Sequence, residues 1–154
     1  MSEKTPEYLE VEKRRLEKLR ETCLQLFPEP TEIIFEIGCG HGDFLTAYAP
    51  LQQPAFCLGI DLVTKRIQSA NKKVTKLGLP NAAFLKADLQ ELMAYLPDHV
   101  RFREVFMLFP DPWPKKRHFK KRMLQHALLK QLAARMGEGG MFALRTDHEG
   151  YFEW

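Results

Sequence analysis

An apolar run ends in alternating glycines at residues 32–43, Glu32-Ile33-Ile34-Phe35-Glu36-Ile37-Gly38-Cys39-Gly40-His41-Gly42-Asp43. The run up to Ile37 predicts a buried strand, and the residues from Asp43 onward predict a helix. Gly38 and Gly40 let the backbone approach a ligand closely and adopt conformations that a side chain would forbid. We therefore expect a strand, a ligand-binding loop and a helix in direct succession.

Apolar runs and helical segments alternate along the rest of the chain. Strands are predicted at 32–37, 56–60, 82–86, 104–109 and 141–145, and helices at 43–49, 64–77, 89–95 and 119–136. Five such alternations predict an α/β fold with a doubly wound, mostly parallel, Rossmann-like sheet. Residues 7–26 have the pattern of an amphipathic helix that Pro28 and Pro30 end. We expect residues 1–30 to flank a ligand-binding domain at 31–154.

Acidic residues stand at the ends of three successive predicted strands. These are Glu36, Asp61 and Asp88. Asp61 has the position from which a carboxylate accepts hydrogen bonds from both hydroxyls of a ribose. Asp88 is placed to meet an adenine amino edge, although an Asp before a helix is also a usual N-cap. Together the three acids predict a nucleoside cofactor.

Asp43 indicates which kind of nucleoside cofactor to expect. It occupies the position of the third glycine in a dinucleotide fingerprint. A negative charge at a helix start repels a diphosphate and tolerates a cation. S-adenosylmethionine carries a sulfonium and an ammonium, so it is favoured over a nicotinamide dinucleotide.

A second motif follows the fourth predicted strand, Phe109-Pro110-Asp111-Pro112-Trp113-Pro114-Lys115-Lys116-Arg117-His118. Asp111 should lie at the carboxyl edge of the sheet, where α/β proteins bind their ligands. Six of the eight residues at 115–122 are Lys or Arg. Charge runs are usually solvated, but basic charge at a helix start opposes the helix dipole, which favours a role in contacting nucleic acid.

Composition restricts the remaining possibilities. The chain has 154 residues, a net charge of +3 and three cysteines. The cysteines form no C-x-x-C pair, so neither a disulfide framework nor a zinc site is indicated, and no histidines stand at metal-ligand spacing. No segment has the pattern of a signal peptide or a membrane span. We expect a cytoplasmic protein without a metal and without a membrane partner; the oligomeric state stays open.

These motifs resemble the tRNA (guanine-N7-)-methyltransferases, a family with the class I S-adenosylmethionine-dependent fold. The matching stretches lie between residues 32 and 151, and the Asp-Pro-Trp-Pro-Lys-Lys-Arg-His element is the most specific of them. The resemblance implies methylation of guanosine 46 at N7 in tRNA. It assigns cofactor binding to the carboxylates Glu36, Asp61, Asp88 and Asp111. From the glycine loop we also expect Gly38 and Gly40 to bind the cofactor, and we expect Asp111 to be catalytic as well. The resemblance assigns substrate binding to Lys115 and Asp147, and RNA contact to Arg117, His118, Phe119, Lys120, Lys121 and Arg122.

Two departures from the family pattern bear on these expectations. The family usually has Glu at the position of Asp61, and the shorter side chain can still accept two hydroxyls. Family members also continue past Thr146-Asp147 with further strands and a Thr-x-x-Glu motif, so the sequence looks shortened, with residues 141–145 at an unprotected sheet edge. The alternatives are a noncatalytic cofactor- or RNA-binding remnant and an adenine-N6 methyltransferase, whose strand-end motif has proline where Trp113 stands.

Overall fold

Five parallel strands form one sheet in the computed structural model, which describes residues 5–154. Residues 1–4 of the predicted flank lie outside the described part. The strand order is β3-β2-β1-β4-β5, with β1 (Thr31–Ile37), β2 (Phe56–Asp61), β3 (Ala82–Lys86), β4 (Val100–Leu108) and β5 (Met136–Arg145). The order changes direction between β1 and β4. In sheets of this kind the crevice beyond that point is where ligands bind.

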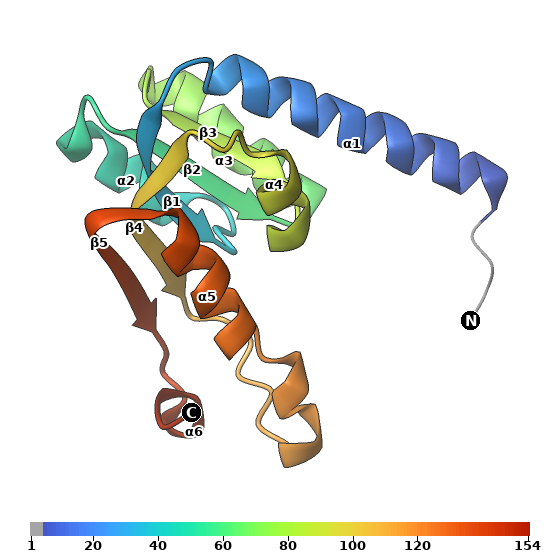
Figure 1. The fold of residues 1–154 in the computed structure, drawn as a ribbon, viewed down its shortest axis with the longest axis vertical. Coiled ribbons are helices and arrows are strands. Elements are labelled where there is room, and N and C mark those ends of the chain that lie inside the picture. The colour runs from blue at the N-terminus through green and yellow to red at the C-terminus, as the bar shows by residue number, and fades with distance from the viewer. Residues whose placement is uncertain (1–4) are drawn as a thin grey trace.

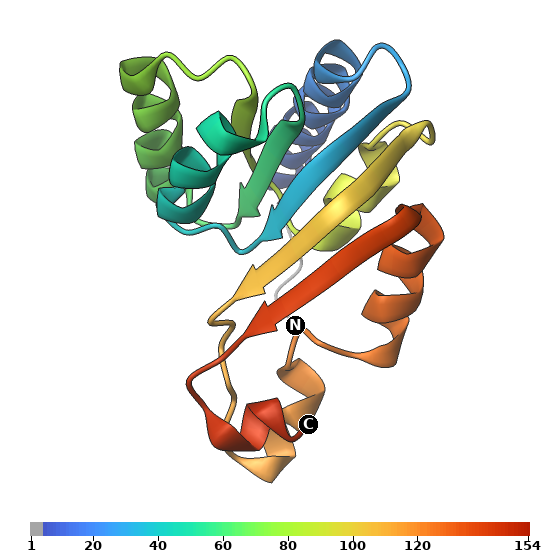
Figure 2. The ribbon, with the colours of Figure 1, turned by 90° about the vertical axis from the view of Figure 1, so that its left-hand side faces the viewer.

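Helices cover both faces of the sheet (Figures 1 and 2). One apolar layer is completed by α2 (Asp43–Gln52) and α3 (Thr64–Leu77), and the other by α1 (Pro6–Leu26), α4 (Leu89–Tyr95) and α5 (His126–Arg135). The prediction of a doubly wound α/β fold is thereby confirmed. Within the described residues no helix combines the length and apolar composition needed to span a bilayer.

The central strand β1 is apolar because both of its faces are covered. Ile33 and Phe35 pack into the layer with α1 and α4, whereas Ile34 packs into the layer with α2 and α3. Phe35 stacks on Phe102 of β4 with the ring centroids 5.0 Å apart. The final turns of α1 take part in this core through Leu19 and Cys23, and the first turns of α1 extend away from the sheet (Figure 1).

The predicted helix at 119–136 is wrong in its first half. Residues Lys116–Lys121 form a 3-10 helix, and an extended link precedes α5, which begins at His126. Arg122 lies in this link, and its side chain is buried. Two strands are longer than predicted, since β4 begins at Val100 and β5 at Met136.

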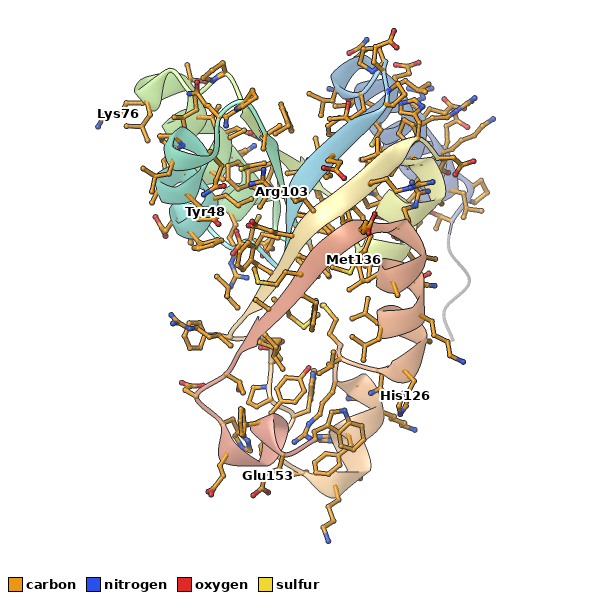
Figure 3. All side chains as sticks on the ribbon, turned by 60° about the vertical axis from the view of Figure 1, so that its left-hand side comes forward. Tyr48, Lys76, Arg103, His126, Met136 and Glu153 are labelled. Carbon is orange, nitrogen blue, oxygen red and sulfur yellow. The ribbon has the colours of Figure 1, made fainter. Side chains whose placement is uncertain are left out.

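Residues 109–125 and 146–154, which we call the lower lobe, pack together below the sheet (Figure 2). The lobe contains the 3-10 helix and α6 (Glu149–Phe152), with Glu153 directly after α6 (Figure 3). Arg122 is at its centre and is only 2% exposed. Its Nε donates to the carbonyl of Pro112 at 2.8 Å, and its Nη1 donates to the carbonyl of Gly150 at 3.0 Å. The guanidinium thus ties the Asp-Pro-Trp element to α6.

Aromatic rings enclose the same guanidinium. The Cζ atom of Arg122 lies 3.8 Å from the ring centroid of Phe119, 4.8 Å from that of Tyr151 and 5.1 Å from that of Trp154. Guanidinium groups stack favourably on aromatic faces when they are removed from water. The assignment of Arg122 to RNA contact is therefore corrected: the side chain is buried and holds the lobe together.

We expect Arg122→Met to lower the free energy of unfolding by about 3 kcal/mol, because the carbonyls of Pro112 and Gly150 lose a charged donor. Urea titration measures this change. Arg117→Met is the matched control; Arg117 is exposed, so its loss should change stability by less than about 0.5 kcal/mol. Equal stability of the two variants would contradict the bracing role of Arg122.

Candidate functional site

A cleft of about 460 Å³ lies at the carboxyl edge of the sheet, beside the switch point. Residues following four different strands line it, because parallel strands end at the same edge. Among them are Gly38 after β1, Asp61 at the end of β2, Asp88 after β3, and Asp111 and Trp113 after β4. Four of the predicted cofactor residues are thus brought together in one cavity.

The glycine loop between β1 and α2 requires glycine for two different reasons. Gly38 lines the cleft with a φ of +73°, a backbone conformation that disfavours side chains. Gly42 also has a φ of +73°, and a Cβ there would stand 2.7 Å from Cβ of Ala70 in α3. Gly42 therefore permits α2 to begin directly against α3, while Gly38 opens the backbone to the cleft.

Asp61 connects the cleft to this loop. Its side chain is almost fully buried and accepts hydrogen bonds from the amides of Gly40 at 3.1 Å and Val63 at 2.8 Å. The guanidinium of Arg66 lies 3.5 Å from Oδ2. An ionised carboxylate has about four acceptor sites, so the two amides leave capacity for a ligand hydroxyl. Gly40, predicted to contact the cofactor, instead holds Asp61 and does not line the cleft.

Glu36 is buried beneath the glycine loop rather than in the cleft wall. It is 3% exposed, and its Oε2 has no hydrogen-bond partner. Burial, with a smaller contribution from the charge of Asp43, raises the pKa of Glu36 to about 8. Ile37 and Gly38, the next two residues, do line the cleft. A cation bound above the loop would favour the ionised form of Glu36 and offset the cost of its burial.

Asp88 is a helix N-cap that also lines the cleft. It is the N-cap of α4, accepting the amide of Glu91 at 2.8 Å, while the Glu91 side chain accepts the Asp88 amide. Glu91 also pairs with Arg15 of α1, and its hydrogen bond to Arg15 lowers the pKa of Glu91. Asp88 is exposed and lines the cleft, so its second carboxylate oxygen faces available space.

The wall after β4 has unusual backbone geometry. Phe109 and Trp113 have φ values of +51° and +43°, in the left-handed region that bulky residues rarely adopt. The Phe109 amide donates to the carbonyl of Arg145 in β5 at 2.7 Å. Such strain persists only where surrounding contacts impose it, and it is concentrated at functional sites. The result is an exposed Asp111 at the cleft, between prolines that restrict its movement.

Except for Lys121, the predicted substrate and RNA contacts lie outside the cleft lining. Lys115 and Asp147 are exposed in the lower lobe. Of the predicted RNA contacts, Arg117, Lys120 and Lys121 are exposed, whereas His118 and Phe119 are half-buried. Phe119 is covered by Arg122 and Trp154, so it serves packing in the lobe.

Sequence reasoning missed several residues of the cleft, including Phe109, Arg66 and Met123. It assigned Lys121 only to RNA, but this residue also lines the cleft with its Nζ 4.7 Å from the Trp113 ring centroid. The place of Arg66 at the cleft could have been predicted, because Arg66 lies in the first turn of the helix that follows Asp61. Met123 carries no such signal because its position depends on the buried Arg122.

The charges of the cleft favour a ligand with cationic and hydroxyl groups. Asp61, Asp88 and Asp111 line it, against the cations Arg66 and Lys121. Carboxylates at fixed strand ends can accept hydroxyl or amine hydrogen bonds. Across residues 5–154 no group of three or more His, Cys, Asp or Glu side chains is arranged to hold a metal ion.

Comparisons with solved structures identify the fold. An rRNA methylase from Streptococcus thermophilus has a TM-score of 0.58 at 14% identity, covering 99% of this chain and 78% of its own. A SAM-dependent methyltransferase from Thiobacillus denitrificans, solved in complex with S-adenosyl-L-homocysteine, has a TM-score of 0.54 at 20% identity, covering 91% of this chain and 48% of its own. At these identities the likeness concerns the fold alone.

Sequence comparisons are more specific. The tRNA (guanine-N(7)-)-methyltransferase of Rhodospirillum rubrum is 33% identical over 130 residues, which are 84% of this chain and 51% of that protein. The enzyme of the same name from Geobacillus kaustophilus is 35% identical over 130 residues, 84% of this chain and 59% of its own length. The chain thus spans about half the length of these curated relatives. The family described as "Putative methyltransferase" matches residues 30–154, and the chain belongs to this methyltransferase family.

Proposed function

We propose that this chain binds S-adenosylmethionine in the cleft and transfers its methyl group to N7 of a guanosine in tRNA. The observation that carries the proposal is the convergence of Asp61, Asp88 and Asp111 on one cleft at the switch point. The names of the curated relatives support this reaction and this substrate. Residues 31–154 would form the cofactor-binding unit, flanked by 1–30.

The residues present fit this cofactor. Asp61, held by two backbone amides, would accept the ribose hydroxyls, and Asp88, which lines the same cleft, would meet the adenine edge. The unpartnered, buried Glu36 offers negative charge below the loop for the ammonium group. When bound, the cofactor supplies an activated methyl group on its sulfonium.

Guanine N7 carries an available lone pair, so the protein needs no strong base or nucleophile. Its main contribution is to hold N7 in line with the methyl group, and such positioning can lower a barrier by roughly 7 to 11 kcal/mol. Positive charge develops on the guanine ring during transfer. Asp111, fixed between prolines at the cleft, is placed to stabilise that charge or to hold the N1 and amino edge. Lys115 and Asp147 would contact the substrate from the lower lobe.

The direct test is incubation of the chain with tRNA transcript and methyl-labelled cofactor, followed by nucleoside analysis for N7-methylguanosine. A matched transcript with 7-deazaguanosine, which has no N7 lone pair, should accept no label. Cofactor and tRNA binding without transfer would favour the noncatalytic alternative, and label on adenine would identify the adenine-N6 alternative.

Asp111→Asn should lower the rate of methyl transfer by about 10²- to 10³-fold, because the charge that stabilises the developing cation is lost. The affinity for tRNA, measured by filter binding, should stay near that of the wild type. Asp98→Asn is the matched control, since Asp98 is exposed in the loop before β4, at the opposite edge of the sheet. Wild-type turnover in Asp111→Asn would exclude this role for Asp111.

Affinity for S-adenosylmethionine should rise between pH 5.5 and 7, by up to about tenfold per pH unit. In the unliganded fold Glu36 has a pKa of about 8 and is therefore protonated over this range. Pairing with the ligand ammonium requires Glu36 to release that proton, so binding becomes easier as pH increases. The ligand amine stays protonated below pH 7, because an α-amino pKa is about 7.7 to 8.0.

Isothermal titration calorimetry in two buffers of different ionisation enthalpy measures both the affinity and the released proton. In Glu36→Gln the affinity should be lower and independent of pH over this range, with no proton released. A pH dependence that survives in Glu36→Gln would show that another group is responsible.

A further inference from the structure

The excess of positive over negative charge in this chain comes from two segments. Helix α3 and residues 115–122 together hold eleven Lys and Arg and no Asp or Glu. The other residues contain twelve Lys and Arg against twenty Asp and Glu. The net charge of +3 is small because the two basic segments offset the net negative charge of the remaining residues. Of the two segments, only the one at 115–122 is a dense run of basic residues in the sequence; the basic residues of α3 are spaced along the helix.

Helix α3 differs in this respect from the other long helix. Helix α1 holds five acidic and five basic residues, and its pairs include Arg14 with Glu10 at 3.1 Å and Arg15 with Glu12 at 2.9 Å. Helix α3 holds five basic residues and no acid. Like charges one turn apart, such as Lys72 and Lys76, destabilise a helix by about 0.2 to 0.5 kcal/mol per pair. No acidic residue within α3 offsets this repulsion.

Two of the five cations in α3 are neutralised and three are not. Arg66 lies 3.5 Å from Asp61, and Lys73 pairs with Asp43. Among residues 5–154, Lys65, Lys72 and Lys76 have no ion-pair partner, and all three side chains are exposed. The three lysines lie along a shallow hollow of about 310 Å³ on the outer surface of α3. Lys76 points away from the body of the protein (Figure 3).

This row of lysines begins at the candidate site. Arg66, beside Lys65, lines the cleft, as does Lys121 of the other basic segment. The two segments follow β2 and β4, which pair with opposite sides of β1, so they flank the switch point from two directions. From Lys65 to Lys76 the helix extends about 16 Å away from the cleft, at 1.5 Å per residue. A long polyanion crossing the cleft could contact both segments at once.

We propose that the lysine face of α3, formed by Lys65, Lys72 and Lys76, binds the phosphate backbone of the RNA substrate outside the cleft, as a second contact beside residues 115–121. The proposal rests on the proposed function, because it takes RNA as the substrate. An anionic membrane is disfavoured, since such a helix inserts its apolar face. The apolar face of α3, with Ile67 and Ala70, is buried against the sheet.

The test measures binding of a fluorescent tRNA transcript by anisotropy, with saturating S-adenosylhomocysteine, between 50 and 300 mM salt. The α3 variant carries Lys65→Gln, Lys72→Gln and Lys76→Gln. The control variant carries Lys13→Gln, Lys18→Gln and Lys130→Gln, three exposed lysines of α1 and α5. Gln has nearly the helix propensity of Lys, so both variants should fold. Cofactor affinity, measured on the same samples, checks this.

Each lost phosphate contact lowers the slope of log Kobs against log salt by about 0.7 to 0.9. We expect the α3 variant to lose about 2 from the wild-type slope and to bind tRNA about tenfold more weakly at 100 mM salt. The control variant should keep the wild-type slope, and both variants should keep wild-type cofactor affinity.

Three results would overturn the inference while leaving the proposed function in place. The first is a wild-type salt slope in the α3 variant, and the second is an equal loss of slope in the control variant. The third concerns vesicles of anionic phospholipid tested in parallel: the α3 variant loses binding to the vesicles but not to tRNA. Failure of the wild-type chain to bind tRNA, with cofactor bound, would instead reject the proposed substrate.

Discussion

The parallel pairing of β1 with both β2 and β4 is the constraint on which the site depends. Parallel strands all end at the same edge of the sheet, so the residues that end them lie side by side along that edge. Asp61, Asp88 and Asp111 are separated by tens of residues in sequence and meet at one cleft for this reason. The pairing is stable because β1 is buried on both faces, which requires an unbroken apolar run and helices on each side. Any change that uncovers β1 would therefore disturb the cleft as well as the core.

The wall of the cleft beyond β4 depends on a second buried group. Arg122 and Tyr151 are the buried residues of the lower lobe, so a guanidinium surrounded by aromatic rings takes the place of an aliphatic core. Arg122 bonds to carbonyls on both sides of the lobe, and Tyr151 adds a contact by accepting the amide of Leu124 at 3.1 Å. Phe109 and Trp113, on either side of Asp111, have left-handed conformations, and Arg122 bonds to the carbonyl of Pro112 between Asp111 and Trp113. The residue next to Asp111 is thus held by a side chain that does not line the cleft and is almost fully buried.

Acidic and basic side chains gather in different parts of the surface, beyond the individual ion pairs. Acidic side chains line the cleft, where a cationic and hydroxyl-bearing ligand would sit, and basic segments follow β2 and β4 outside it. This arrangement separates two ligands of opposite character on one surface. The buried Glu36 belongs to the acidic part, and burial raises the pKa of its carboxyl group in the unliganded protein. A protein that binds a small cation and a long polyanion together needs such a separation, because intermixed acidic and basic groups would pair with each other instead of with the two ligands.

Sequence alone determined the α/β class, the alternation of elements, the glycine loop and the acids at the strand ends. These follow from local patterns: periodicity marks the elements, and position after an apolar run marks the strand ends. Tertiary structure alone decided three further matters. It placed Arg122 inside and Lys121 at the cleft, although both belong to the same basic run. It placed Gly40 where its amide holds Asp61, and it buried Glu36 outside the cleft lining. It also left Lys65, Lys72 and Lys76 of α3 without ion-pair partners among residues 5–154, whereas Arg14 and Arg15 of α1 are paired. Burial and pairing depend on which segments meet in space, and a linear pattern does not contain that information.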